Sequence, residues 1–276
     1  MDTHIFRCDL HTHSRNSHDA VHSVAEMAKS AIEKNISAFA ITDHCDMQYF
    51  VERDMPACIA NSVAETAQAA ADFAGKVTLL KGVEIGEGIW LEEETKALLQ
   101  SHDFDVIIGS VHEIKFKNYR KPYSLIDFTQ MSSEEIPEFL NMYFDDLLET
   151  LKKLPCDVMA HLTCPFRYIN GKYHLGVDAR QFERKIDEIL RYIIDHSIAL
   201  EINTSGVAPE NGYFMPDEWI VEKYKNMGGY LVTIGSDAHI PDNLGKGFDE
   251  AVSLLRKYHF THYYYYKNRK SIPCAI

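Results

Sequence analysis

Histidine, carboxylate and amide side chains recur in this chain where predicted strands end. Seven short segments carry them: Asp9-Leu10-His11-Thr12-His13, Thr42-Asp43-His44, Gly82-Val83-Glu84, Gly109-Ser110-Val111-His112, Met159-Ala160-His161, Glu201-Ile202-Asn203 and Gly235-Ser236-Asp237-Ala238-His239. Side chains at the carboxyl ends of parallel barrel strands point into one shared crater, where such folds keep their chemistry. Imidazoles and carboxylates that converge there are ligands for divalent metal ions. The pattern therefore predicts a metallohydrolase site.

Some of these segments have metal-ligand character of their own. His11 and His13 stand two apart on a strand, so both rings face the same side and can hold one ion. Glu84 follows an apolar run and would be costly to bury without a cation. A single histidine after a strand is usually a surface or core residue, but here six of the fourteen histidines stand at strand ends. The joint pattern, rather than any one segment, indicates a metal site.

A strand-then-helix alternation runs through the chain and would position these segments. The predicted strands cover residues 5–13, 38–42, 77–83, 105–111, 157–161, 198–203 and 230–236. The predicted helices cover residues 24–32, 59–73, 91–99, 134–154, 179–196, 217–227 and 248–258. Runs such as Val106-Ile107-Ile108 are continuously apolar rather than alternating, which is typical of parallel strands covered on both faces.

Seven strand–helix units without a linker or low-complexity stretch favour one closed or nearly closed barrel over residues 1–276. An open doubly wound sheet is the main alternative, but no G-x-G-x-x-G follows the first predicted strand. The tail, residues 260–266, has strand propensity and is expected to pack against the outside of the barrel. The predicted fold class is α/β, a TIM-like barrel in a single domain.

Composition and charge exclude several classes of partner. The chain has 276 residues, of which 46% are apolar and 25% charged, as in ordinary globular proteins. The formal net charge of −13 argues against nucleic acid or an anionic membrane as a partner. No apolar run approaches the roughly 20 residues of a membrane span. Bound divalent cations would still allow this acidic protein to attract a small phosphate ester.

Location and assembly are predicted from weaker signals. Residues 1–4 enter a strand directly, without a basic or apolar leader, so no signal peptide is expected. The six cysteines form no C-x-x-C pair, which favours reduced thiols in the cytoplasm. The tyrosine run 263–266 allows an edge-strand contact between subunits, so a monomer or a homodimer is expected.

A metal cluster of this kind suits hydrolysis of a phosphate monoester. The reaction needs a hydroxide at neutral pH and positive charge around the phosphoryl oxygens, and clustered divalent ions supply both by lowering the pKa of bound water toward ~7. Nitrogen-rich ligation favours zinc, manganese or iron over magnesium. Asp237 or His239 is the candidate general acid that protonates the leaving alkoxide.

Arginines that follow the ligand segments are candidates for phosphate recognition, because the guanidinium fork binds oxygens bidentately. Arg167, six residues beyond His161, is the first choice. Arg120 is the second, and Arg15 is a further candidate. Asn203, at the end of the sixth predicted strand, is a candidate for the polar end of the substrate.

In their order and spacing, the segments D-L-H-T-H, T-D-H, G-V-E, G-S-V-H, A-H-L and G-S-D-A-H resemble the polymerase and histidinol phosphatase (PHP) superfamily. The run Glu201-Ile202-Asn203-Thr204-Ser205-Gly206 more specifically resembles its stand-alone histidinol-phosphatase branch. The resemblance covers nearly the whole chain. It implies a distorted seven-unit (β/α)7 barrel, three divalent metal ions, and hydrolysis of L-histidinol phosphate to L-histidinol and phosphate in histidine biosynthesis.

By matching position, the resemblance also implies three ligand sets that share one carboxylate. The first metal would be held by His11, His13, Glu84 and Asp237, the second by Glu84, His112 and His161, and the third by Asp19, His44 and His239. The spacing from the H-x-H pair favours Asp19, with the neighbouring His18 as the alternative and His22 as a distant third choice. Glu84, as the bridging ligand, would join Asp237 and His239 in the catalytic centre.

Three alternative hypotheses about the function have to be weighed against this one. A phosphoesterase of the same superfamily acting on phosphotyrosine, a nucleotide or a sugar phosphate would need the same ligands, because they serve the phosphate rather than the alcohol. A metal-stabilised binding module without activity, like the barrel domains attached to some polymerases, is a reading from another class. A carbon–nitrogen hydrolase of the amidohydrolase type relies on a carboxylated lysine, and no matching lysine ends a strand here.

Overall fold

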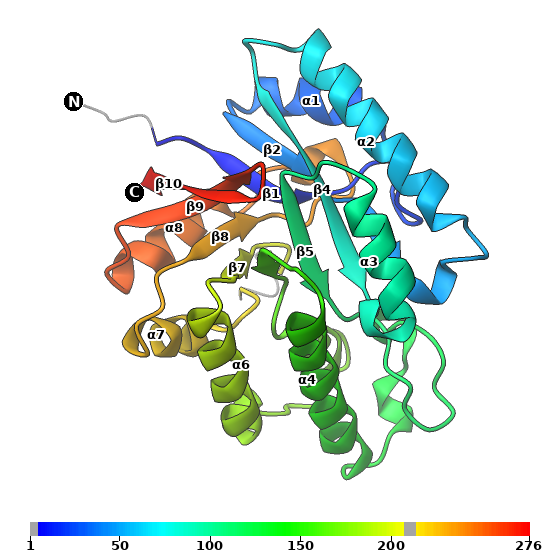
Figure 1. Cartoon of the computed structure of the whole chain (residues 1–276). Coiled ribbons are helices and arrows are strands. Elements are labelled where there is room, and N and C mark those ends of the chain that lie inside the picture. The colour runs from blue at the N-terminus through cyan, green and yellow to red at the C-terminus, as the bar shows by residue number, and fades with distance from the viewer. Residues whose placement is uncertain (1–4, 207–213) are drawn as a thin grey trace.

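The computed structural model describes residues 5–206 and 214–276, so the predicted direct entry of residues 1–4 into a strand lies outside the described residues. Parallel strands form the centre of the fold, and helices surround them (Figure 1). The central strands are β1 (Cys8–Thr12), β2 (Ala38–Ile41), β3 (His44–Asp46), β4 (Thr78–Gly86), β5 (Val106–Ser110), β6 (Val158–Met159), β7 (Ala199–Asn203) and β8 (Val232–Gly235). No helix in the described ranges combines the length and the apolar character needed to cross a membrane.

The helices follow the strands in the predicted alternation. They are α1 (Val24–Glu33), α2 (Met55–Asp72), α3 (Glu92–Gln100), α4 (Glu135–Lys153), α5 (Cys164–Phe166), α6 (Glu183–Asp195), α7 (Glu218–Asn226) and α8 (Phe248–Lys257). Shorter helical turns are η1 (Met47–Tyr49), η2 (Gly88–Leu91), η3 (Tyr123–Leu125), η4 (Phe128–Gln130), η5 (Arg167–Lys172), η6 (Ala179–Phe182) and η7 (Pro241–Asn243). The predicted helix 179–196 therefore starts as the η6 turn and becomes α-helical only at α6.

Seven strands follow one another around the barrel in the order β1-β2-β4-β5-β6-β7-β8, and their pairings are all parallel. The segment after β8 joins the ring to β1: the backbone N–H of Asp237 donates to the carbonyl of His11 (2.8 Å), and that of His13 donates to the carbonyl of Ala238 (2.9 Å). Strands β1, β2, β5, β7 and β8 are buried along their whole length, as is expected of parallel strands covered on both faces. The predicted seven-strand TIM-like barrel is confirmed.

The carboxyl ends of two strands differ from the prediction. β3 is an unpredicted strand that pairs with the end of β4 and sets His44 opposite Glu84, so β4 runs on to Gly86 instead of ending at residue 83. The predicted strand 157–161 contracts to β6, because His161 has a left-handed backbone conformation (φ 23°) that turns the chain out of the sheet.

The tail forms a hairpin of β9 (His262–Lys267) and β10 (Lys270–Ala275), of which only the first strand is predicted. The hydroxyl of Tyr263 accepts from the backbone N–H of Cys8 (3.0 Å), and that of Tyr266 donates to the carbonyl of Asp157 (3.2 Å). Cys8 begins β1 and Asp157 precedes β6, so the hairpin lies at the amino-terminal end of the barrel and not on its helical exterior. That position leaves the opposite end, where the ligand segments lie, to the connecting loops.

Candidate metal centre

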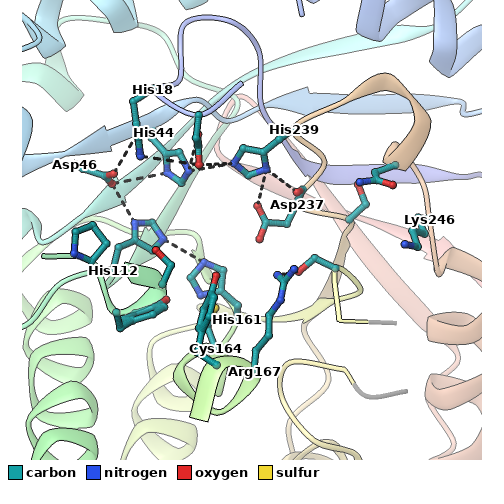
Figure 2. A pocket seen from close by; sticks show the side chains of 18 residues that line it. His18, His44, Asp46, His112, His161, Cys164, Arg167, Asp237, His239 and Lys246 are labelled. Atoms are coloured by element: carbon teal, nitrogen blue, oxygen red, sulfur yellow. Dashed lines mark hydrogen bonds and ion pairs between the residues drawn. The ribbon is translucent and has the colours of Figure 1, made fainter. Parts of the chain in front are cut away.

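The carboxyl-terminal mouth of the barrel holds a cavity of about 340 Å³. Of the predicted ligands, the cavity lining contains Asp19, His44, His112, His161, Asp237 and His239 (Figure 2). The other three, His11, His13 and Glu84, lie next to these residues and are fully buried. The structure thus brings together all nine predicted ligands, although they come from widely separated parts of the chain.

Glu84 is the common neighbour of the imidazoles. Its Oε1 lies 2.9 Å from Nε2 of His161 and 3.2 Å from Nε2 of His112. Its Oε2 lies 3.2 Å from Nε2 of His11 and 2.9 Å from Nδ1 of His44. Burial alone would raise the pKa of Glu84, but His11 and His112 hold that pKa well below its usual value. The carboxylate is therefore ionised, and each oxygen faces a different group of nitrogens.

A first group of donors consists of His11, His13 and Asp237, whose ligand atoms all lie within 4.8 Å of one another. Nε2 of His13 lies 3.2 Å from Oδ1 of Asp237, and Nε2 of His11 lies 3.8 Å from the same oxygen. A second group, within the same limit, consists of Glu84, His112 and His161. These two groups agree with two of the three ligand sets that the family resemblance implies.

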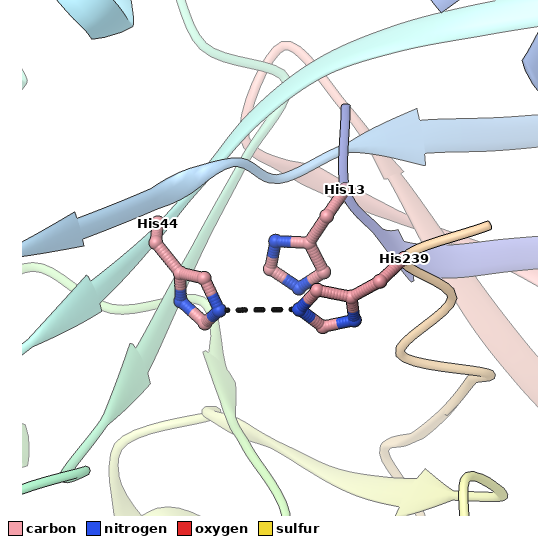
Figure 3. A group of neighbouring side chains, drawn as sticks. All are labelled: His13, His44 and His239. Carbon is pink, nitrogen blue, oxygen red and sulfur yellow. Dashed lines mark hydrogen bonds between the residues drawn. The ribbon is translucent and has the colours of Figure 1, made fainter. Parts of the chain in front are cut away.

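A third group consists of His13, His44 and His239, whose rings come from three different chain segments and face one another (Figure 3). The Nε2 atoms of His44 and His239 lie 3.4 Å apart. Asp19 adds a carboxylate: its Oδ2 lies 3.2 Å from Nε2 of His239, and its Oδ1 lies 3.7 Å from Nε2 of His44. Asp19 therefore occupies the place expected of the third acidic ligand.

The two alternatives to Asp19 make other contacts. His18 also lines the cavity, but its Nδ1 faces Asp46 at 3.7 Å instead of the pair of His44 and His239. His22 faces Glu26 on α1 (3.7 Å) and is absent from the cavity lining. The geometry therefore favours Asp19 over both histidines.

Four of the imidazoles contact a protein partner through Nδ1. Their Nε2 atoms therefore point toward the other candidate metal ligands. The contacts are His11 with Glu201 Oε1 (2.7 Å), His13 with Ser17 Oγ (3.1 Å), His112 with Asp46 Oδ1 (3.1 Å) and His239 with the carbonyl of Asp237 (2.9 Å). The Ser17 hydroxyl donates to Asp43 (2.9 Å), so it accepts from His13. A proton fixed on Nδ1 leaves the Nε2 lone pair free for a metal, which is how metal-binding histidines are commonly oriented.

Several buried polar atoms of the site have no hydrogen-bond partner among the described residues. They are Nε2 of His11, Nε2 of His13, Nδ1 of His44 and Oε2 of Glu84. An unsatisfied buried polar atom costs about 1–3 kcal/mol, so a protein seldom keeps several in one place without a function. A cluster of divalent cations would satisfy these atoms together, and the mixed imidazole and carboxylate donors suit such ions.

Of the four residues predicted to bind substrate, Arg167 alone belongs to the cavity lining. Its Nη1 donates to Oγ of Ser205 (3.0 Å), and Figure 2 shows the side chain pointing into the cavity. Arg15 instead pairs with Glu65 (2.8 Å) and is 56% exposed, while the Arg120 side chain lies exposed outside the lining. Long, charged side chains on loops are free to turn to solvent, which sequence position alone does not reveal.

Asn203 is fully buried, and it contacts protein instead of the cavity: its Nδ2 donates to Oε2 of Glu201 (3.1 Å). Glu201 stands in one of the seven strand-end segments, but the strand-end pattern predicts no role for it. Asp46 is likewise not predicted, although it follows His44 by two residues, a spacing that places two side chains on one strand face. Lys246, a further cation in the lining, gave no signal beyond its loop position.

Comparisons with known proteins identify the family. The family model named PHP domain matches residues 9–205, which is more than half of the chain. This chain belongs to the PHP family. It is 30% identical over 253 residues to a Clostridium acetobutylicum protein named Probable histidinol-phosphatase, covering 89% of this chain and 91% of that relative.

Two further matches to this PHP chain come from Lactococcus lactis. A protein named Histidinol-phosphatase is 26% identical over 255 residues, covering 91% of each chain. The crystal structure of a histidinol phosphate phosphatase, complexed with zinc, L-histidinol and phosphate, superimposes with a TM-score of 0.80 at 23% identity, covering 98% of this chain and 100% of that one. The predicted family is confirmed by the family model, and the predicted barrel by the structural match.

Proposed function

We propose that this PHP chain is a metal-dependent phosphomonoesterase that hydrolyses L-histidinol phosphate to L-histidinol and phosphate. The proposal is supported by relatives of nearly equal length that carry the name histidinol-phosphatase. The observation that carries it is the convergence, beside one cavity, of buried imidazole and carboxylate atoms that lack hydrogen-bond partners, together with Arg167 in the same lining. A cavity of about 340 Å³ is at the small end of ligand sites, which suits a small phosphate ester.

We propose three divalent ions, zinc, manganese or iron. Their ligands would be His11, His13, Glu84 and Asp237 for one, Glu84, His112 and His161 for another, and Asp19, His44 and His239 for the third. When bound, such ions supply a water of lowered pKa and positive charge around the phosphoryl oxygens. The acidic ligands account for part of the net charge of −13, so the overall charge is no obstacle to an anionic substrate.

The protein side chains would bind the phosphate and handle the proton. Arg167 would hold phosphoryl oxygens with its guanidinium fork, which Ser205 keeps in place. Lys246, in the same lining, would add a second positive charge.

During hydrolysis a water oxygen bonds to phosphorus while the bond from phosphorus to the histidinol oxygen breaks. Burial alone would raise the pKa of Asp237, but His11 and His13 hold it well below its usual value, so this carboxylate is ionised. Of the two candidate acids in the lining, His239 would therefore give the leaving alkoxide its proton, and the proton lost by the attacking water would restore it.

A substrate panel combined with elemental analysis tests the proposal. The purified protein should contain zinc, manganese or iron, and should release phosphate from L-histidinol phosphate with a kcat/KM at least about tenfold above that for phosphotyrosine, nucleotide and sugar phosphates. Dialysis against a chelator should abolish the activity, and the added metal should restore it. Fast turnover of another ester beside slow turnover of histidinol phosphate would replace the substrate. A metal-loaded protein inactive on every ester would favour a binding module.

A further inference from the structure

Glu201 joins two of the strands that carry the proposed metal ligands. It lies on β7, is 1% exposed, and its Oε1 accepts from Nδ1 of His11 at 2.7 Å. Its Oε2 accepts from the backbone N–H of His161 (2.8 Å) and from Nδ2 of Asn203 (3.1 Å). One buried carboxylate thus contacts the ring of His11, near the end of β1, and the backbone of His161, just after β6.

The two oxygens of Glu201 accept from all three neighbours. Each neighbour is a donor, and a carboxylate group offers two acceptor oxygens, so Glu201 can satisfy them all. Accepting from Nδ1 holds a proton of His11 on that atom, so Nε2 is the nitrogen that is left to face a metal. That Nε2 is buried without a hydrogen-bond partner and faces Glu84 and Asp237. Glu201 therefore sets both the tautomer and the ring orientation of His11.

The same carboxylate is connected by hydrogen bonds to the phosphate-facing side of the cavity. Oδ1 of Asn203 accepts from Oγ of Ser205 (2.7 Å), and that hydroxyl oxygen accepts from Nη1 of Arg167 (3.0 Å). A continuous path thus runs from Arg167 through Ser205, Asn203 and Glu201 to His11. Every side chain on it is buried or half-buried, so solvent screens these bonds little.

We infer that Glu201 is a positioning residue, which sets His11 for metal binding and aligns the metal ligands with the phosphate-binding Arg167. The inference rests on the proposed metal centre. It assigns Asn203 the role of orienting Glu201 instead of contacting the substrate. Glutamine at position 201 has nearly the same shape, but its amide nitrogen would face at least one of the three donors. The expected loss is therefore in metal affinity more than in fold.

The test compares the zinc affinity of three variants by chelator competition. Glu201→Gln should bind zinc about 10- to 100-fold more weakly than the wild type, and Asn203→Ala should show a smaller loss. The matched control is Asp105→Asn: Asp105 is a buried carboxylate that accepts backbone N–H groups from Lys81 and Asn268 at the other end of the barrel. It should cost stability without changing zinc affinity. As a spectroscopic readout, the visible spectrum of bound Co²⁺ should change in Glu201→Gln and stay unchanged in Asp105→Asn.

Zinc affinity of Glu201→Gln within about two-fold of the wild type, or an equal loss in Asp105→Asn, would overturn the inference. If Glu201→Gln does not fold, Asn203→Ala decides: unchanged zinc affinity and an unchanged Co²⁺ spectrum count against it. The outcome is separable from that of the proposed function. A wild type that fails to hydrolyse histidinol phosphate would refute that function but leave the zinc comparison intact.

Discussion

Oε1 of Glu84 lies 2.9 Å from Nε2 of His161, although 77 positions separate these residues in the chain. Glu84 lies on β4 and His161 follows β6, with β5 paired between the two strands. Parallel strands deliver their carboxyl ends to the same mouth, so the two side chains meet there. Since the other oxygen of Glu84 faces His11 at 3.2 Å, one substitution at position 84 affects two of the three proposed ligand sets.

Replacing Glu84 with glutamine should empty part of the metal centre. The amide keeps the shape of the side chain, but it loses the negative charge and one acceptor that the imidazoles face. We expect the metal content per chain to fall and phosphate release to drop by roughly 10³-fold or more, because the preorganised charge of the site is lost. Elemental analysis and steady-state kinetics measure both effects. Asp105→Asn is the control, and metal content equal to wild type in Glu84→Gln would contradict the bridging role.

Metal affinity should rise with pH up to about 9. Burial alone would lower the pKa of His44, but Asp46 and Glu84 raise it to about 9. Burial likewise opposes protonation of His112, yet Glu84 and Asp46 raise its pKa well above the usual value. Both imidazoles therefore carry protons in the metal-free protein at neutral pH, and a metal must displace them. Chelator competition at several pH values measures the trend, and an affinity that is constant from about pH 6 to 9 would refute it.

Arg167 should contribute to catalysis without contributing to metal binding. Its guanidinium lies in the cavity lining and is held by Ser205, whereas Arg120 is exposed outside the lining. Arg167→Ala should lower kcat/KM for histidinol phosphate by roughly 10²–10³-fold, as loss of a preorganised donor to a phosphoryl oxygen does, while the metal content stays constant. Arg120→Ala serves as the matched control and should change little. Similar kinetics for the two variants would remove Arg167 from the phosphate site.

The general acid can be recognised from the leaving group. An alkoxide needs a proton as it departs, whereas nitrophenolate is stable without one. Removal of the acid should therefore slow hydrolysis of histidinol phosphate far more than hydrolysis of p-nitrophenyl phosphate. Asp237→Asn and His239→Gln are to be compared on both esters at full metal loading. If each variant loses the same factor on the two esters, neither residue donates the proton.

Gly235 provides the space in which Glu201 reaches His11. A Cβ at position 235 would lie 2.4 Å from Oε1 of Glu201 and 2.6 Å from Cβ of His11. Gly235→Ala should therefore lower the free energy of unfolding by about 1–3 kcal/mol through overpacking and should also weaken zinc binding. In the matched variant Gly109→Ala the new Cβ meets the Cys156 side chain at 2.5 Å instead, so it should lose stability alone. Equal zinc affinity in both variants would show that this close approach has no part in the site.

Periodicity and strand-end residues were enough to predict the barrel and eight of the nine candidate ligands, and Asp19 was added by the family resemblance. Continuous apolar runs indicate parallel strands, and parallel strands in a barrel expose their carboxyl ends at one mouth whatever the loops do. His11, Glu84 and His161 could therefore be grouped without coordinates, because each directly follows or ends a strand. The family resemblance added how the ligands divide among the ions.

The tertiary structure alone decided the contacts that depend on loop paths and side-chain direction. Sequence position already ranked Arg167 above Arg120 and Asp19 above His18, but the contacts that each of them makes are set by where its loop folds back, and no local period encodes that. The bond between Glu201 and His11 spans 190 positions and exists only because closure of the barrel brings β7 and β1 to opposite sides of Gly235. Sequence thus determined which groups reach the mouth, since apolar runs and the residues that end them can be read locally, and long-range packing determined which of them touch.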